Sequence, residues 1–155
     1  MKNLSKRQTV IFAAVVVMVF LVIWVIWGNS ALEVNEYEVV SDRIPQGFDG
    51  FRIAQVSDLH NAQFGSGNSR LIAALSQTEP DIIVLTGDLI DSDKPDLDIA
   101  LAFARQAVKI SPVYYITGNH EAWVPEYEDL KIGLIEAGVT VLDNQKVQLT
   151  REGER

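Results

Sequence analysis

The fold is decided by residues 81–91, which read Asp-Ile-Ile-Val-Leu-Thr-Gly-Asp-Leu-Ile-Asp. The apolar, β-branched start of this stretch predicts a buried strand over Asp81–Thr86. Gly87 then allows a tight turn, so we expect Asp88 to point back toward the end of the strand. Asp91 adds a second carboxylate shortly after it. A buried strand that ends in metal-type ligands is the pattern that the rest of the chain repeats.

The same pattern occurs once before and once after this stretch. A predicted strand over Phe51–Val56 leads into Ser57-Asp58-Leu59-His60, and one over Val113–Thr117 leads into Gly118-Asn119-His120-Glu121. Further strands are predicted over Glu36–Ser41, Val139–Leu142 and Val147–Thr150, and helices over Ser69–Gln77, from Lys94-Pro95-Asp96 to Val108, and over Tyr127–Ala137. Strands that alternate with helices of about ten residues indicate βαβ units, and hence an α/β fold with a mostly parallel sheet.

The beginning of the chain predicts a membrane anchor. Val10–Trp27 contains no polar side chain, and as a helix it would span roughly 27 Å, close to the hydrocarbon thickness of a bilayer. Lys2, Lys6 and Arg7 precede it, and no acidic residue occurs before Glu33. The positive-inside rule then places the N-terminus in the cytoplasm and the rest of the chain outside. A cleaved signal peptide is the alternative, but its apolar core is usually shorter, at about 7–15 residues.

Composition limits the classes of function. The net charge is −8, and outside the first 28 residues ten basic residues face twenty-one acidic ones. This part of the chain is too acidic to bind nucleic acid through its overall charge. The chain has no cysteine, so neither a disulfide nor a thiolate metal ligand is available.

The three polar segments are expected to meet. In open α/β sheets, ligands bind beyond the carboxyl ends of the strands, so Asp58, His60, Asp88, Asn119 and His120 should lie at one edge. In an extended stretch, two side chains separated by one residue can reach the same side and clasp one ion. A carboxylate together with an imidazole suits manganese, iron or zinc.

The remaining roles follow from the side-chain chemistry. The two oxygens of Asp88 could bridge two ions, and the amide oxygen of Asn119 is a neutral ligand. His120 could protonate a leaving group or stabilise charge on a phosphoryl oxygen. Asp91 and Glu121 would not bind an ion themselves. They would orient imidazoles or metal-bound groups by contacting them.

Each motif has an ordinary explanation when it is taken alone. Asp and His after a strand often only cap a turn, and Gly-Asp and Gly-Asn are common turn pairs. Their joint occurrence favours a metal site. The only two histidines of the chain, His60 and His120, both follow a predicted buried strand, each beside a carboxylate or an amide.

In this order, the three motifs resemble the first three motifs of the calcineurin-like metallophosphoesterase superfamily. The basic N-terminus and single anchor are similar to its bacterial membrane-anchored branch. The resemblance implies a β-sandwich flanked by helices, of which this chain would supply the first half. It also implies two divalent metal ions, with Asp58 and His60 on the first, Asp88 bridging both, and Asn119 on the second. His120 would lie near the scissile phosphate.

The chain also departs from the family pattern, which continues with a lone His and then Gly-His-x-His. No histidine follows His120. We therefore expect a basic cytoplasmic tail over residues 1–8, a transmembrane signal-anchor over 9–28, a connector over 29–50 and an incomplete phosphoesterase domain over 51–155. We expect a single-pass protein of the cell membrane with an extracytoplasmic domain. Its substrate would be a phosphomonoester, phosphodiester or pyrophosphate, lipid-linked or not. The alternatives are a truncated, non-catalytic membrane protein, and assembly with a second polypeptide that carries the remaining ligands.

Overall fold

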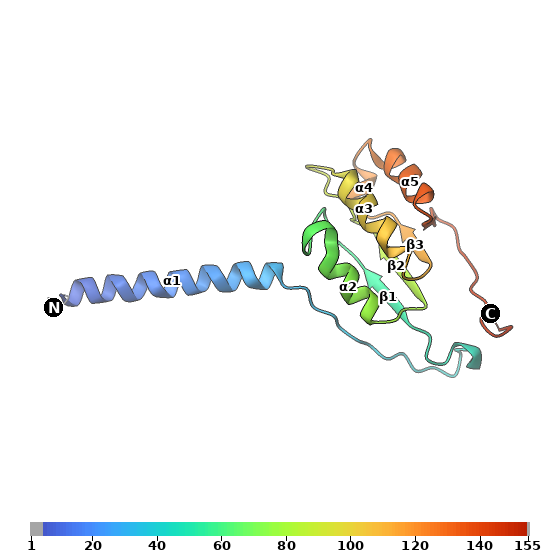
Figure 1. Cartoon of the computed structure of the whole chain (residues 1–155), viewed down its shortest axis with the longest axis horizontal. Coiled ribbons are helices and arrows are strands. Elements are labelled where there is room, and N and C mark those ends of the chain that lie inside the picture. Colours follow the sequence, from blue (N-terminus) through green and yellow to red (C-terminus); the bar gives the residue numbers. More distant parts are fainter. Residues whose placement is uncertain (1–4, 155) are drawn as a thin grey trace. The chain divides into compact units, whose positions relative to one another are not determined.

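The structure is a computed structural model that describes residues 5–154 (Figure 1). It divides into two compact units, one up to Glu33 and one from Val34 onward. The first unit is dominated by α1 (Lys6–Ser30), and a capping box starts this helix. The Gln8 amide donates to Ser5 Oγ (3.4 Å), and the Ser5 amide donates to Gln8 Oε1 (2.9 Å).

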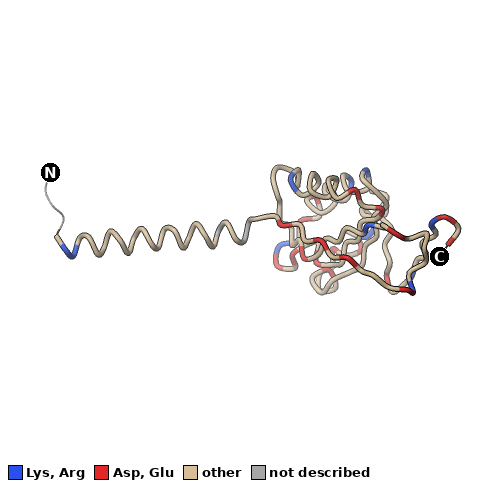
Figure 2. Tube along the Cα trace, turned by 90° about the horizontal axis from the view of Figure 1, so that it is seen from below, with Lys and Arg blue, Asp and Glu red and all other residues tan. Residues whose placement is uncertain are grey.

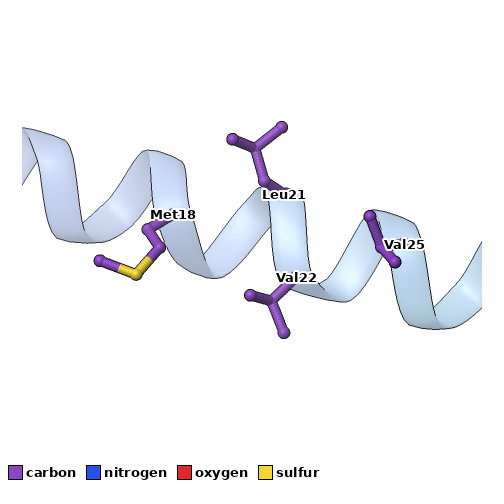
Figure 3. A pocket seen from close by; sticks show the side chains of 4 residues that line it. All are labelled: Met18, Leu21, Val22 and Val25. Carbon is purple, nitrogen blue, oxygen red and sulfur yellow. The ribbon is translucent and has the colours of Figure 1, made fainter.

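Helix α1 is long and apolar enough to cross a membrane. Its segment Lys6–Val25 has a mean hydropathy of 2.7. After Arg7 it carries no charged side chain, and Figure 2 shows this stretch of helix without blue or red residues. Figure 3 shows a shallow hollow on its surface, and only apolar side chains line it: Met18, Leu21, Val22 and Val25. Their spacing follows successive turns of one helix, so the hollow offers no polar group for chemistry.

The strand predicted over Glu36–Ser41 is wrong. Residues 31–41 have no regular secondary structure, and Tyr37 and Val40 are 87% and 85% exposed. Alternating β-forming residues do not make a strand unless a neighbouring strand accepts their backbone hydrogen bonds. In the described structure no strand lies beside this segment.

The second unit contains one parallel sheet with strand order β1-β2-β3-β4. The strands are β1 (Ile53–Val56), β2 (Ile82–Thr86), β3 (Val113–Ile116) and β4 (Thr140–Val141). In the register, Ala54 lies opposite Ile83, which lies opposite Val113. The predicted α/β class and parallel sheet are therefore confirmed.

Helices connect the strands and cover one face of the sheet (Figure 1). They are α2 (Ser69–Gln77), α3 (Leu97–Ala107), α4 (Asn119–Ala122) and α5 (Tyr127–Glu136), with short 3-10 turns η1 (Gln46–Phe48) and η2 (Ser66–Asn68). Right-handed crossovers that advance in one direction put every connecting helix on the same side. Asp96 caps α3, because its Oδ1 accepts from the Ile99 amide at 3.2 Å.

The hydrophobic core lies between this helix layer and the sheet. Its fully buried side chains include Ile83, Phe103, Tyr115, Leu130 and Leu134. The opposite face of the sheet is more open: Ile53 is 59% and Ile116 is 43% exposed. The core therefore holds the strands, and with them the loops at their carboxyl ends, against one rigid layer.

The strand predicted over Val147–Thr150 is also wrong. This segment has no regular structure, and it leads into a turn closed by two backbone hydrogen bonds between Arg151 and Glu154. The turn packs near the start of the sheet, because the Arg151 guanidinium lies 3.6 Å from Asp81 Oδ2 and 5.5 Å from the Phe51 ring centre. Within the described residues no strand pairs with this segment.

An ion pair fastens the end of β4 to α5, and it predicts a pH-dependent stability. Lys131 bonds to Asp143 Oδ2, and the Tyr127 hydroxyl donates to Asp143 Oδ1 at 2.6 Å. The bond from Lys131 and then that from Tyr127 hold the Asp143 pKa below its ordinary 3.8, while the bond to Asp143 raises the Lys131 pKa above 10.5. This stabilisation is therefore complete above pH 3.8 and declines as the pH falls through the lowered pKa. It declines again as the pH rises through the raised pKa of Lys131.

We expect Asp143→Asn to lower the melting temperature by a few degrees at pH 7, and by less below pH 3.8. Thermal melts of the intact chain in detergent, at several pH values, measure this difference. The exposed Asp42→Asn is the matched control and should have little effect at any pH. An Asp143→Asn difference that is the same at pH 3 and pH 7 would contradict this assignment.

Candidate metal centre

The loop after β1 runs alongside the loop after β2, as a continuation of the parallel ladder. The amide of Asp58 donates to the carbonyl of Gly87 (3.1 Å), and that of His60 donates to the carbonyl of Asp88 (2.9 Å). These contacts place His60 Nε2 3.8 Å from both Asp58 Oδ1 and Asp88 Oδ2. The predicted convergence at the carboxyl edge is therefore observed for these three side chains.

The local conformation differs from the expected one. Asp58 and His60 do not lie in an extended stretch, because their φ angles are +54° and +45°, and Asp88 has φ +51°. Left-handed conformations are uncommon for residues other than glycine and are concentrated in tight turns and functional sites. Asp58 and His60 come together because the chain coils between them, not because side chains alternate along a strand.

Two glycines let the second and third loops touch through their backbones. Gly87 has φ +91° and turns the chain, as expected. Gly118 does not turn the chain in this way, because its φ and ψ are −96° and −171°, which is extended. Its importance is steric instead: a Cβ atom on Gly118 would lie 2.1 Å from Asp88 Oδ1 and 2.5 Å from the Asp88 amide nitrogen.

We expect Gly87→Ala to destabilise the fold much more than Gly50→Ala. Both glycines have positive φ, but a Cβ on Gly87 would lie 2.5 Å from the Gly118 backbone, whereas one on Gly50 meets nothing within 4 Å. The collision should add about 1–3 kcal/mol to the cost of the strained φ. Urea unfolding of both variants measures the difference. Equal losses would show that the contact between the two loops is not tight.

The carboxylate of Glu121 holds these loops together. Glu121 is fully buried, and its Oε2 accepts from the amides of Asp88 (2.8 Å) and Gly118 (2.8 Å). Its Oε1 accepts from the amides of Leu89 (2.7 Å) and Ile90 (3.0 Å). The sequence-based expectation was that Glu121 orients an imidazole or a metal-bound group. Its hydrogen bonds instead go to four backbone amides, and so it fixes the path of the chain around Asp88.

His120 lies on the first turn of α4, and its orientation is fixed by two backbone contacts. Its own amide donates to Asp88 Oδ1 at 2.9 Å, and its Nδ1 accepts from the Ser92 amide at 2.9 Å. An Nδ1 atom that accepts a hydrogen bond carries no proton, so neutral His120 has its proton on Nε2. The ring also meets His60 edge to face, with 4.3 Å between the ring centres.

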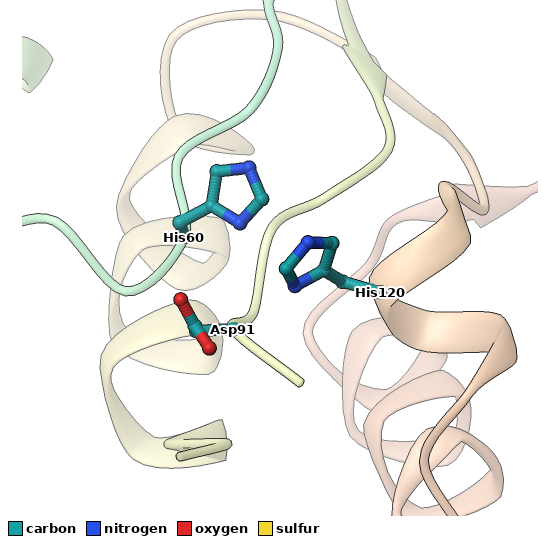
Figure 4. Close-up of side chains that lie close together, drawn as sticks. All are labelled: His60, Asp91 and His120. Carbon is teal, nitrogen blue, oxygen red and sulfur yellow. The ribbon is translucent and has the colours of Figure 1, made fainter. Parts of the chain in front are cut away.

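Two groups of side chains come close enough to hold an ion. In each, the ligand atoms lie within 4.8 Å of one another: one group is Asp58, His60 and Asp88, and the other is His60, Asp91 and His120. Figure 4 shows the second group, with its three side chains pointing toward one another. The first group suits a cation better. A histidine that ligates a metal usually donates from its other nitrogen, whereas His120 Nδ1 accepts.

The donor set also fits metal ions by its charge. Asp58, Asp88 and Asp91 are three carboxylates around two histidines, and His60 Nδ1 is buried without a hydrogen-bond partner among the described residues. Carboxylates this close repel one another and would repel a phosphate unless cations lay between them. Asn119, the remaining predicted ligand, is exposed at the start of α4 beside His120.

Fold and site together define an α/β domain whose carboxyl-end loops bring together side chains of the kinds that bind divalent metals. Comparison with known proteins gives the family. The model of the calcineurin-like phosphoesterase family matches residues 51–148. The chain therefore belongs to the calcineurin-like phosphoesterase family.

Individual relatives come from vertebrates and bacteria. The chain is 29% identical over 154 residues to a transmembrane protein with metallophosphoesterase domain of Bos taurus, covering 96% of the chain and 35% of that protein. A protein of the same description from Danio rerio is 27% identical over 149 residues, covering 95% of the chain and 34% of that protein. YkuE, an uncharacterized metallophosphoesterase of Bacillus subtilis, is 40% identical over 63 residues, which is 39% of the chain and 22% of that protein. The chain thus spans about a third of the length of the two vertebrate relatives.

Three residues of the site were not singled out from the sequence. Ser92 acts through its backbone amide, which no side chain reveals. Tyr115 lies in the core, where burial first and then the negative charge of Glu121 raise its pKa far above the usual range, so it stays neutral. Trp123 lies beside the His120 ring and is 69% exposed. Its position three residues after His120, on one side of a helical turn, could have revealed it.

Proposed function

We propose that this chain carries part of the centre of a membrane-anchored phosphoesterase that uses divalent metal ions. The observation that carries the proposal is the convergence of Asp58, His60 and Asp88, whose ligand atoms lie within 4.8 Å of one another beyond the carboxyl ends of β1 and β2. Membership of the calcineurin-like phosphoesterase family makes a phosphoester the substrate class. Phosphomonoesters, phosphodiesters and pyrophosphates all belong to this class.

The residues present would share the metal ions as follows. Asp58 and His60 would hold the first ion, Asp88 would bridge it to a second, and Asn119 would hold the second. A carboxylate and imidazole set of this kind favours manganese, iron or zinc. When bound, two such ions activate water and neutralise charge on the phosphoryl oxygens.

His120 would act on the substrate through Nε2. Because the Ser92 amide donates to Nδ1, the neutral ring offers an Nε2–H group as a hydrogen-bond donor. Of the two roles considered from the sequence, this supports stabilisation of charge on a phosphoryl oxygen over protonation of the leaving group. Asp91 lies close to the imidazoles of His60 and His120 and would orient them.

Helix α1 would anchor the domain to the membrane. Its apolar segment Lys6–Val25 has the length and hydropathy of a membrane span, and two relatives are described as transmembrane proteins. The predicted anchor over 9–28 lies within this helix. Lys6 and Arg7 precede its apolar part. This order supports a helix that crosses the cell membrane with its N-terminus in the cytoplasm and the domain outside it. A lipid-linked phosphoester would then be accessible to the site.

Removal and return of metal tests the proposal. The intact chain, reconstituted in lipid vesicles and stripped with a chelator, should hydrolyse neither p-nitrophenyl phosphate nor bis(p-nitrophenyl) phosphate. Manganese, iron or zinc should restore the hydrolysis, whereas calcium should not, because it prefers sites with oxygen ligands only. Trace hydrolysis that is equal with and without metal would contradict the proposal.

A further inference from the structure

We infer that Trp123 forms a binding surface for a planar aromatic group that the substrate carries next to its phosphoester. The inference rests on the proposed function, since it assigns one part of the substrate of that site. Trp123 would be a specificity-determining residue outside the metal ligands.

The position of Trp123 is set by the same short helix that presents His120. The Trp123 amide donates to the His120 carbonyl at 3.3 Å, which closes the last turn of α4. The two rings therefore face the same side, with 5.6 Å between their centres and an angle of 36° between their planes. The indole is held against the site by the backbone and by the neighbouring ring.

The aromatic rings continue from the metal ligands to Trp123. His60, a proposed ligand, meets His120 at 4.3 Å between ring centres, and His120 meets Trp123 at 5.6 Å. A phosphoester bound at Asp58, His60 and Asp88 would thus lie two rings away from the indole. His120 lies between them and would itself contact the phosphate, so the indole lies one ring away from this proposed phosphate contact.

The exposure of Trp123 indicates that its indole stacks on a ligand and does not pack into the core. It is 69% exposed, although a tryptophan buries more apolar area than other side chains when it packs into a core. An open indole face binds planar rings by stacking, with little dependence on their identity. A cage for a quaternary ammonium group would need several aromatic walls, and among the described residues the ring contacts of Trp123 involve His120 alone.

Substitutions at Trp123 separate stacking from simple apolar contact. Trp123→Phe keeps an aromatic face, and Trp123→Leu keeps an apolar side chain without one. On an aryl phosphodiester with metal, Trp123→Leu should lose about tenfold in kcat/KM, while Trp123→Phe should lose much less. On a dialkyl phosphodiester the two variants should match the wild-type chain. Each comparison divides the kcat/KM of a variant by that of the wild-type chain on the same substrate. The intrinsic reactivity of the leaving group therefore cancels.

A binding measurement tests the inference without turnover. In the zinc-loaded intact chain, p-nitrophenylphosphonate should quench Trp123 fluorescence, and Trp123→Phe gives the background from Trp24 and Trp27. Affinities by calorimetry should be about tenfold weaker in Trp123→Leu for p-nitrophenylphosphonate and unchanged for ethylphosphonate. Equal weakening for both ligands, or no change for either, would overturn the inference. Absent hydrolysis in the wild-type chain would count against the proposed function alone, because this titration still decides the role of Trp123.

Discussion

Replacing Asp88 with asparagine is expected to abolish metal-dependent hydrolysis while leaving the fold intact. Asp88 Oδ1 accepts from the His120 amide, and an asparagine oxygen can accept the same bond. The variant therefore removes a negative charge and one ligand oxygen with little change of shape. Asp88 is 8% exposed and lies between the first and third loops, and in the group that it forms with Asp58 and His60 it is the buried residue.

The expected size of the effect follows from the proposed bridging role. Loss of an outer partner of a metal ligand typically costs about 10–100-fold in metal affinity, and loss of a bridging ligand should cost more. Activity should fall at least about 100-fold to 1,000-fold, as when one electrostatic group of an active site is removed. Calorimetric titration with zinc and the hydrolysis assay measure the two quantities.

The neighbouring Asp93→Asn is the matched control for this prediction. Asp93 lies in the same loop after β2, is exposed, and contacts Asp91 through its backbone amide. Its substitution should leave both metal affinity and activity within about twofold. If Asp88→Asn bound zinc as tightly as the wild-type chain, the proposed metal site would be wrong.

Much of the scaffold of the site could be predicted from the sequence. Residues 82–85 form an apolar run that is too short for a helix, and Gly87 follows shortly after it, so both the strand and its end were predictable. The parallel arrangement then required the carboxyl ends of β1, β2 and β3 to meet at one edge. For the same reason the approach of His60 to Asp88 could be expected before the structure was known.

The contacts that refine the site could not be predicted in this way, because they involve backbone groups. Nothing in the sequence shows that the Ser92 amide reaches His120, or that the extended Gly118 touches Asp88. The left-handed conformations of Asp58 and His60 depend on hydrogen bonds to a loop far away in the sequence. Side-chain chemistry suggested the ligands, whereas tertiary contacts determine how they are held.

The two wrong strands have one physical cause. Residues 36–41 and 147–150 have β-forming sequences, but each needs a neighbouring strand to bind its amides and carbonyls. In the described structure the four paired strands lie elsewhere. A pattern within one segment records its preference, and pairing depends on what the rest of the fold places beside it.

Replacing Glu121 with glutamine is expected to destabilise the domain by at least about 3 kcal/mol, although the two side chains have nearly the same shape. The glutamate offers two oxygens, each of which accepts from two backbone amides. A glutamine has one oxygen, and its NH₂ group would face two of these donors. Each buried donor left unpaired costs about 1–3 kcal/mol, and the loss of charge weakens the remaining bonds.

Urea unfolding of the intact chain in detergent measures this loss, with the exposed Glu136→Gln as the control that should change stability by less than about 0.5 kcal/mol. The same variant should also weaken zinc binding, because either pair of amides that the glutamine leaves unpaired includes one in the loop that carries Asp88. Asp88→Asn should instead lose zinc affinity and keep its stability. If Glu121→Gln kept its stability and lost only zinc affinity, Glu121 would act on the metal, and its role in holding the loops would be refuted. We expect Glu121→Gln to lose both stability and zinc affinity, and Asp88→Asn to lose zinc affinity alone. This difference would show that Glu121 shapes the site and that Asp88 binds the ion.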